Sequence, residues 1–175
     1  MKHFGKICCL FLVLSVLLSA GCRRQGLHAR ADITVPPVPT AVYTESAAPD
    51  VTILDANGNS IRLSDLFGKP IVLKFYHPDH ARALDDLVLL QEAFDVHKED
   101  IQFLILTAED PSSLVFPEDV RISLPFFTDP DGSAFSAYHI VDMPVTVFID
   151  SDGFIAAEAR DSISKEALDF GINMF

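Results

Sequence analysis

Residues 55–75, which read D-A-N-G-N-S-I-R-L-S-D-L-F-G-K-P-I-V-L-K-F, decide the fold. Asn57-Gly58 accepts positive φ at little cost, so the short β-prone runs on either side of it are predicted to pair as a hairpin. A short helical turn then ends at Gly68. Residues 71–76 form a nearly continuous apolar run, which is typical of a central strand buried on both faces.

The rest of the chain alternates helix and strand signals. A helix is expected after Pro78, with Asp79 as its N-cap and an apolar stripe at helical spacing. The members of that stripe are Leu84, Leu87, Val88, Gln91 and Phe94. Further strands are expected at residues 101–106, 124–127, 145–150 and 154–158, with a short helix reaching Tyr138 and a closing helix over 164–174. This order predicts an α/β sandwich, a mixed central sheet with helices on both faces.

Two later stretches make the pattern specific. Residues 138–153 read Y-H-I-V-D-M-P-V-T-V-F-I-D-S-D-G, and residues 129–132 read D-P-D-G. Together with residues 55–75 they resemble, in the same order, the TlpA/ResA and AhpC-TSA (redoxin) group of thioredoxin-fold proteins. The resemblance implies a thioredoxin-like sandwich with an N-terminal β-hairpin over residues 50–175.

The resemblance assigns a cis-proline to Pro144. Cis X-Pro bonds are about 5–6% of such bonds in folded proteins, and one usually has a structural reason. In the group this proline keeps the preceding backbone, here Met143, facing the active site, where it can pair with an extended substrate strand. An ordinary trans proline at the start of an edge strand is the alternative.

The sequence departs from the group at its redox cysteines. Aligning Phe75 with the group's phenylalanine puts the two cysteine positions of the C-x-x-C motif at His80 and Ala83. Thiol–disulfide exchange and thiol peroxidase chemistry both need a thiolate. No catalytic residue is therefore expected, and the chain is not expected to be an enzyme of either kind.

The three cysteines lie near the start of the chain. Residues 1–21 are interpreted as a lipoprotein signal peptide, a basic start followed by an apolar run too short to span a bilayer. Cys8 and Cys9 lie in that run. Cys22 follows small residues as in a lipobox, so it is predicted to be lipidated; ordinary signal-peptidase cleavage or an uncleaved anchor are the alternatives. Residues 22–49, rich in Pro, Ala, Ser and Thr, are expected to be a tether.

These features predict a lipid-anchored protein of the bacterial cell envelope that faces the periplasm. In a Gram-negative organism, the lack of Asp after Cys22 favours the outer membrane. The 25 acidic residues against 13 basic ones argue against nucleic-acid binding and against attraction to anionic lipid, so the acyl chains would supply the membrane contact. The expected partner is an envelope protein or an extended peptide.

Two other functions remain open. The resemblance itself implies a thiol-disulfide oxidoreductase or a peroxiredoxin-like antioxidant protein. A copper or other metal site is the second, with His77 and His80 as ligands and His139 or Met143 nearby. Solvated loop histidines are the favoured interpretation, so neither a metal nor another cofactor is expected. The acids Asp79, Asp85 and Asp86 are interpreted as capping and dipole partners of the helix start, not as catalysts.

Overall fold

The computed structural model describes residues 46–175, so the predicted signal peptide, Cys22 and residues 23–45 of the predicted tether lie outside the described residues. The strands are β1 (Ser46–Ala47), β2 (Thr52–Leu54), β3 (Ser60–Arg62), β4 (Ile71–Phe75), β5 (Gln102–Thr107), β6 (Phe126–Thr128), β7 (Val145–Ile149) and β8 (Phe154–Arg160). The helices are α1 (Ala83–His97), α2 (Ser133–Ala137) and α3 (Lys165–Ile172), with 3-10 turns η1 (Leu63–Leu66) and η2 (Pro111–Ser113).

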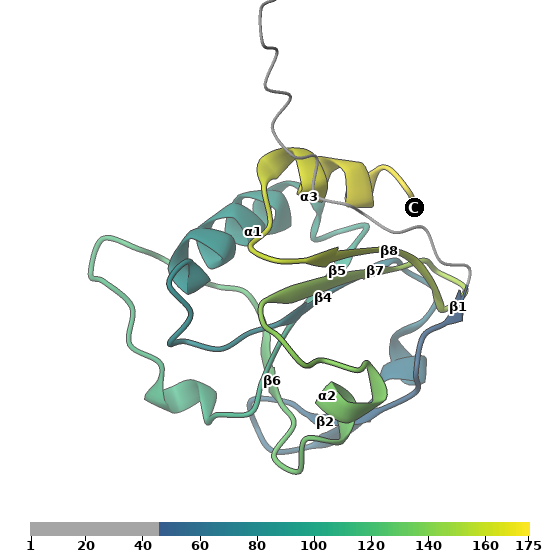
Figure 1. Ribbon diagram of the computed structural model, residues 1–175, viewed down its shortest axis with the longest axis horizontal. Coiled ribbons are helices and arrows are strands. Elements are labelled where there is room, and N and C mark those ends of the chain that lie inside the picture. Colours follow the sequence, from purple (N-terminus) through teal and green to yellow (C-terminus); the bar gives the residue numbers. More distant parts are fainter. Residues whose placement is uncertain (1–45) are drawn as a thin grey trace, which may run out of the picture. The chain divides into compact units, whose positions relative to one another are not determined.

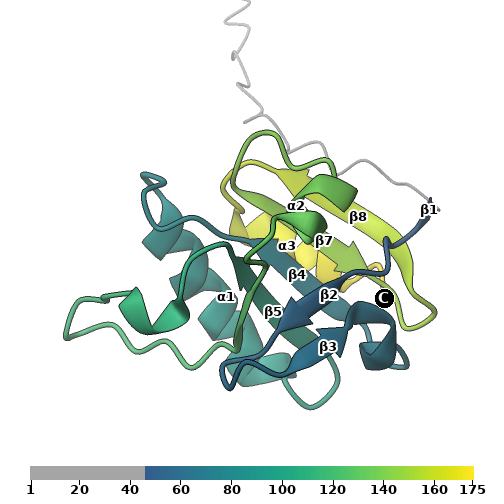
Figure 2. The same ribbon diagram turned by 90° about the horizontal axis from the view of Figure 1, so that it is seen from below.

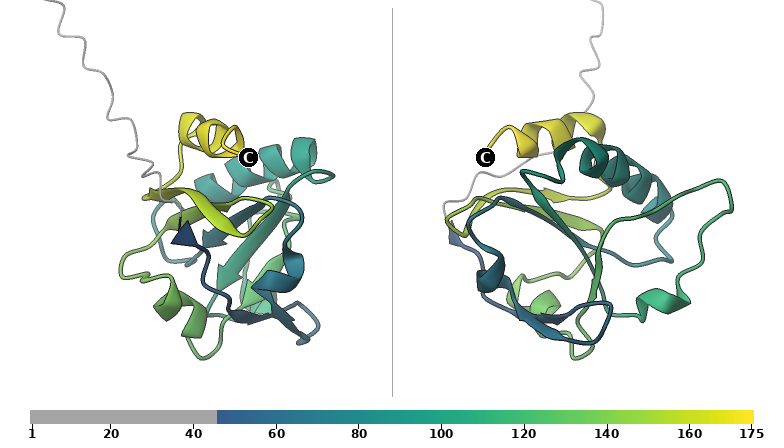
Figure 3. Two further views of the ribbon diagram at one scale, coloured as in Figure 1. Left: turned by 90° about the vertical axis from the view of Figure 1, so that its right-hand side faces the viewer. Right: turned by 180° about the vertical axis from the view of Figure 1, so that it is seen from behind.

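One mixed sheet carries the fold. Its strand order is β1-β8-β7-β4-β5-β6-β2-β3. β4, β5 and β6 run parallel, whereas β7 runs antiparallel to both β4 and β8. Helices α1 and α3 cover one face and α2 lies against the other (Figures 1 and 3). The predicted mixed sheet with helices on both faces is confirmed.

Alternate residues of β4 feed two apolar layers. Ile71, Leu73 and Phe75 point to the layer on the α2 side, and Val72 points to the layer under α1 and α3. All five residues of β4 are buried, as expected for the central strand. The alternation leaves Lys74 on the side of α1, where its charge lies inside an otherwise apolar layer.

The predicted hairpin lies at one edge of the sheet, where β2 and β3 pair antiparallel (Figure 2). Gly58 has a φ of +80°, a conformation that a residue with a side chain adopts only at a cost. The Asp55 carboxylate accepts hydrogen bonds from the backbone N–H groups of Asn57 and Asn59, both at 2.8 Å. Both the glycine and this carboxylate fix the turn.

The folded domain begins earlier than the sequence predicts. Residues 46–49 were expected in the tether, but β1 pairs antiparallel with β8, and the Ala48 N–H donates to the Gly153 carbonyl at 2.8 Å. Ala48 is buried in the layer on the α2 side. The prediction failed because this segment is ordered by a strand from the far end of the chain, which local composition does not reveal.

Helix α1 also begins later than predicted. Its N-cap position is Arg82, with no side-chain hydrogen bond, so Asp79 is not the N-cap. Residues 77–82 form tight turns instead, in which the His80 N–H donates to the His77 carbonyl and the Ala83 N–H to the His80 carbonyl. The buried face of the helix is rotated from the predicted stripe. Its buried residues are Ala83, Asp86, Leu87, Leu90 and Gln91, whereas Val88 is 37% exposed.

The remaining elements lie close to their predicted positions. Strand β6 begins two residues later and ends one residue later than the predicted 124–127, and α3 is shorter at both ends than the predicted 164–174. The Ser164 hydroxyl caps α3 by accepting the Ala167 N–H at 3.2 Å. Within residues 46–175, no helix has both the length and the hydropathy needed to cross a membrane.

Candidate functional site

The two motifs that carry the family resemblance meet at one end of the sheet. Phe75, the last residue of β4, pairs with Val145, the first residue of β7. This antiparallel register brings the turn after β4 beside the loop before β7. The Met143–Pro144 peptide bond in that loop is cis, the form that the resemblance implies. Pro144 is buried, and Met143 is half-buried.

The two positions that the sequence predicts to align with the family's cysteines lie at the start of α1. His80 is half-buried in the turn before the helix, and Ala83, the first helical residue, is buried against the core. The His80 Nδ1 accepts the Arg82 N–H at 3.3 Å, and the His77 Nδ1 accepts the Asp79 N–H at 3.2 Å. Both imidazoles therefore hold the local turn together.

His77 and His80 belong to no larger cluster of His, Cys, Asp and Glu side chains in the described part of the chain. Among the described residues, no group of three or more His, Cys, Asp or Glu side chains lies close enough to hold a metal ion. The His77 Nε2 faces one carboxylate, with 3.7 Å to Glu109 Oε1. The residues present give no support to the metal-binding hypothesis for His77 and His80.

His139, which the sequence placed near that site, follows the C-cap of helix α2. Its φ of +52° is the one positive value at a non-glycine residue in the described part of the chain. The His139 N–H donates to the Ser136 carbonyl at 3.1 Å, and the Ile140 N–H donates to the Phe135 carbonyl at 2.9 Å. This is the hydrogen-bond pattern of a Schellman motif, and it accounts for the backbone conformation.

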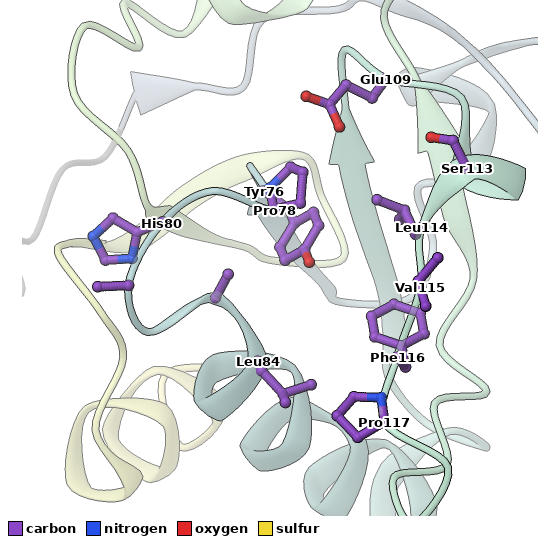
Figure 4. Close-up of a pocket in the computed structure, with 12 residues that line it drawn as sticks. Tyr76, Pro78, His80, Leu84, Glu109, Ser113, Leu114, Val115, Phe116 and Pro117 are labelled. Carbon is purple, nitrogen blue, oxygen red and sulfur yellow. The ribbon is translucent and has the colours of Figure 1, made fainter.

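A cavity of about 280 Å³ opens between the turn after β4 and the loop over residues 109–117 (Figure 4). Tyr76, His80 and Leu84 line one side, and Glu109 and Phe116 line the other. A second, larger hollow of about 690 Å³ lies between the β2–β3 turn and strand β6. It contains no residue from the turn after β4 or from the loop before β7. The smaller cavity is therefore the one that belongs to this site.

Tyr76 gives the cavity a polar group. The residue is 5% exposed, and its hydroxyl points into the cavity in Figure 4. The hydroxyl forms no hydrogen bond with the other described residues. Burial, and next the charge of Glu109, raise the pKa of Tyr76. The ring packs edge-on against Phe126, with 6.0 Å between centroids, which fixes its direction.

Tyr76 and Glu109 were not identified from the sequence. Tyr76 was interpreted only as the end of a buried strand, and Glu109 was given no role. The two residues come together because β4 and β5 are parallel neighbours, so the segments after their carboxyl ends share one edge of the sheet. No motif in the sequence indicates that these two residues lie close together.

A buried ion pair lies beneath the site. Lys74 Nζ of β4 is 2.5 Å from Asp86 Oδ2 of α1, and neither side chain is exposed. Burial lowers the pKa of Lys74, an effect that the neighbouring Asp86 carboxylate opposes. Asp86 lies in the first turn of α1, where a dipole partner was expected, but its ion pair with Lys74 was not predicted. Asp85, the adjacent acid, does lie at the surface, 4.0 Å from Arg82.

The loop before β7 presents unpaired backbone. Residues 141–143 form no backbone hydrogen bond with other residues of the described range 46–175. Val141 is 89% exposed. An extended segment can pair with such a backbone as an added strand.

Residues 46–175 contain no cysteine, so the described domain has no thiol for redox chemistry.

Comparison with known proteins agrees with this geometry. The AhpC/TSA family model matches residues 44–158. A similar curated protein is the thiol-disulfide oxidoreductase ResA of Geobacillus kaustophilus, 26% identical over 133 residues that cover 74% of this chain and 76% of ResA. ResA of Geobacillus thermodenitrificans is 26% identical over 130 residues, covering 73% and 75%.

Solved structures show the same fold. A putative thiol:disulfide interchange protein DsbE from Chlorobium tepidum superposes with a TM-score of 0.65 at 22% identity, covering 74% of this chain and 94% of its own. The exposed lipoprotein thioredoxin of Streptococcus pneumoniae superposes with a TM-score of 0.60 at 22% identity, covering 73% of this chain and 100% of its own. The chain belongs to the AhpC/TSA family and has a thioredoxin-like fold.

Proposed function

We propose that this chain is a lipid-anchored envelope protein whose thioredoxin-like domain binds an extended segment of a partner protein without redox chemistry. One observation carries the proposal: His80 and Ala83 stand where the family has its cysteines, and residues 46–175 contain no cysteine elsewhere. Thiol–disulfide exchange begins with attack of a thiolate on a disulfide sulfur, and this domain has no sulfur that can attack.

The proposed binding surface is the loop before β7, residues 141–143 beside Pro144. The unpaired backbone there favours addition of an extended segment, because main-chain hydrogen bonds supply affinity without a preference for sequence. The exposed Val141 adds apolar area at the same place. A binding module needs only this surface and the rigid sheet behind it, and neither depends on a thiol.

The proposed location rests on Cys22 and the segment before it. Small residues precede this cysteine as in a lipobox, and two acyl chains suffice for stable membrane attachment. The pneumococcal structure named above is described as an exposed lipoprotein, which supports the combination of a lipid anchor with this fold. Mass spectrometry of the protein extracted from membranes tests the anchor, with Cys22→Ala as the control.

Redox activity is the first test. The full-length protein is assayed for reduction of insulin by dithiothreitol and for consumption of hydrogen peroxide, with a thioredoxin and a peroxiredoxin as positive controls. We expect no turnover above the rate without protein. Turnover clearly above that rate would overturn the proposal and favour the oxidoreductase function that the names of the ResA relatives describe.

Site-specific crosslinking in cells is the second test. A photo-crosslinking amino acid at position 141 should capture a partner protein, whereas the same residue at position 96 should not. Val96 is a matched control, since it is also an exposed valine, 74% exposed, but lies on α1. Equal capture from both positions, or no capture from position 141, would contradict binding beside Pro144.

A further inference from the structure

We propose that the cavity between Tyr76 and Glu109 binds a lysine or arginine side chain of the partner segment. This inference rests on the proposed function and adds the chemistry of the ligand. The cavity lies on the β5 side of the end of β4, and Pro144 lies on the β7 side. Neighbouring strands are about 4.8 Å apart, so one extended segment can span both places.

The Tyr76 hydroxyl is the first observation that points to a ligand. It is held in the wall of the cavity by a side chain that is more than nine-tenths buried, and no described residue bonds to it. The hydroxyl oxygen is open to the cavity, so a ligand there can reach it. A ligand with N–H groups would satisfy the oxygen of this hydroxyl.

Glu109 sets the sign of the ligand's charge. Its carboxylate stands at the rim of the same cavity (Figure 4), with a side chain 41% exposed. Burial is the main cause that raises the pKa of Tyr76, and the negative charge of Glu109 adds to it. An ammonium or guanidinium group in the cavity would gain a charge-assisted hydrogen bond to this carboxylate. A carboxylate in the same place would meet only repulsion from Glu109.

The positive groups around the cavity do not reverse this preference. The His77 imidazole lies 3.7 Å from Glu109 Oε1 and faces one side of the carboxylate. The Arg82 guanidinium lies 4.0 Å from Asp85, so its charge is partly balanced. The His80 Nδ1 is an acceptor for the Arg82 N–H.

The walls of the cavity suit the stem of such a side chain. Leu84, Leu114 and Phe116 give the cavity apolar walls. Lysine and arginine bury their methylene stems on surfaces of this kind while the charged head finds a polar partner. The aromatic faces of Tyr76 and Phe116 also attract a cation. At about 280 Å³ the cavity is below the ~300–1,000 Å³ of small-molecule sites, which fits a single side chain.

The charge of the whole domain acts in the same direction. Residues 46–175 contain 23 Asp and Glu against eight Lys and Arg. Such an excess steers basic segments toward the surface and disfavours acidic ones. The cavity would give that general attraction a defined point of contact.

A peptide series tests the inference by NMR with the full-length, nitrogen-labelled protein in a neutral detergent. The probes are Ac-Ala-Ala-Lys-Ala-Ala-amide and two variants in which norleucine or glutamate replaces the lysine. We expect the lysine peptide to bind about fivefold to tenfold more tightly than the norleucine peptide, and the glutamate peptide to bind most weakly. The largest shifts should fall on Tyr76 and on residues 109–117.

Two matched variants localise the effect. Glu109→Gln should remove the preference for lysine over norleucine, whereas Glu118→Gln should keep it. Glu118 is an exposed glutamate in the same segment that does not line the cavity, so both variants lose one charge. Tyr76→Phe keeps the ring but removes the hydroxyl. It should weaken the binding of the lysine peptide and leave the binding of the other two peptides unchanged. The spectrum of each free variant shows whether it is folded.

The outcomes separate this inference from the proposed function. Equal affinity for the lysine and norleucine peptides, with shifts at residues 141–143, would overturn the cation site and leave the binding module intact. The same preference in Glu109→Gln and Glu118→Gln would also overturn the site. Turnover in the insulin or peroxide assay would overturn the proposed function, whatever the peptide series shows.

Discussion

Lys74 Nζ and Asp86 Oδ2 lie 2.5 Å apart in the interior of the domain, and both side chains are fully buried. The pair joins the middle of β4 to the first turn of α1. It therefore fixes the start of α1, which follows the turn over residues 77–82. The second carboxylate oxygen, Asp86 Oδ1, has no hydrogen-bond partner among the described residues.

Removal of one member of this pair should strongly destabilise the domain. A buried charge without its counterion costs about 3–5 kcal/mol of unfolding free energy. We therefore expect Asp86→Asn and Lys74→Met each to lower the free energy of unfolding by roughly that amount. Urea denaturation measures the change. Asp85→Asn is the matched control, because its side chain is 75% exposed and the change should stay within about 0.5 kcal/mol.

The double variant Lys74→Met/Asp86→Leu distinguishes an ion pair from two separate packing effects. Replacing both charges with apolar side chains removes the desolvation cost of each, so the double variant should be clearly more stable than either single variant. Additive losses in the double variant would show that the two charges are not energetically coupled.

The same pair shows how far the sequence predicts the fold. The run at residues 71–76 identified a central strand despite its lysine, because the surrounding apolar residues outweigh one charge. The partner of Lys74 was not predicted, since Asp86 looked like an ordinary acid of a helix start. Only the packing of α1 on the sheet brings the two together, and local sequence does not contain that information.

One part of the candidate site could be predicted from the sequence, namely the part formed by the two motifs that carry the family resemblance. The resemblance placed Pro144 and Met143 beside His80, and the antiparallel register of β4 and β7 brings them to one end of the sheet. The Tyr76–Glu109 cavity was not predictable, because it depends on which strand is the parallel neighbour of β4.

His139→Gly should stabilise the domain. His139 adopts a φ of +52° as the residue that follows the C-cap of α2, a position where glycine is the usual residue. The left-handed conformation costs about 1–2 kcal/mol for a residue with a Cβ atom, and the greater chain entropy of glycine offsets part of the gain. We expect a net gain of about 1 kcal/mol in urea denaturation. His139→Ala keeps the Cβ atom and should give no such gain; equal gains would contradict the backbone explanation.

Asp50 should make the free energy of unfolding depend on pH in the acid range. Its carboxylate accepts hydrogen bonds from the Arg62 side chain and, at 3.0 Å, from the Ser64 N–H. These bonds, with that of Arg62 foremost, hold the pKa of Asp50 below 3.8, its ordinary value. A depressed pKa in the folded state contributes stability at pH values above 3.8, and this contribution is lost as the pH falls through the folded pKa.

The difference in unfolding free energy between wild type and Asp50→Asn should therefore be constant near neutral pH and shrink below about pH 4. Urea denaturation over a series of pH values measures it. Arg62→Gln removes the largest cause of the low pKa and should reduce the same pH-dependent difference. A difference that does not change with pH would show that Asp50 titrates alike in the folded and unfolded chain.

Gly171→Ala should destabilise the domain although it improves helix propensity. A Cβ atom at Gly171, in the last turn of α3, would lie 2.3 Å from ring carbons of Phe148. Phe148 is 1% exposed and packs against Phe175, so its ring has little room to move. Alanine gains about 1 kcal/mol over glycine within a helix, but forcing atoms into a filled core costs about 1–3 kcal/mol.

Because the overlap is with core atoms, the packing cost should outweigh the propensity gain, and the free energy of unfolding should fall by about 1–2 kcal/mol. The Phe148→Leu background provides the control, since a smaller side chain leaves room for the new methyl group. There, Gly171→Ala should cost less or become stabilising. An equal loss in both backgrounds would mean that contact with the Phe148 ring is not the cause.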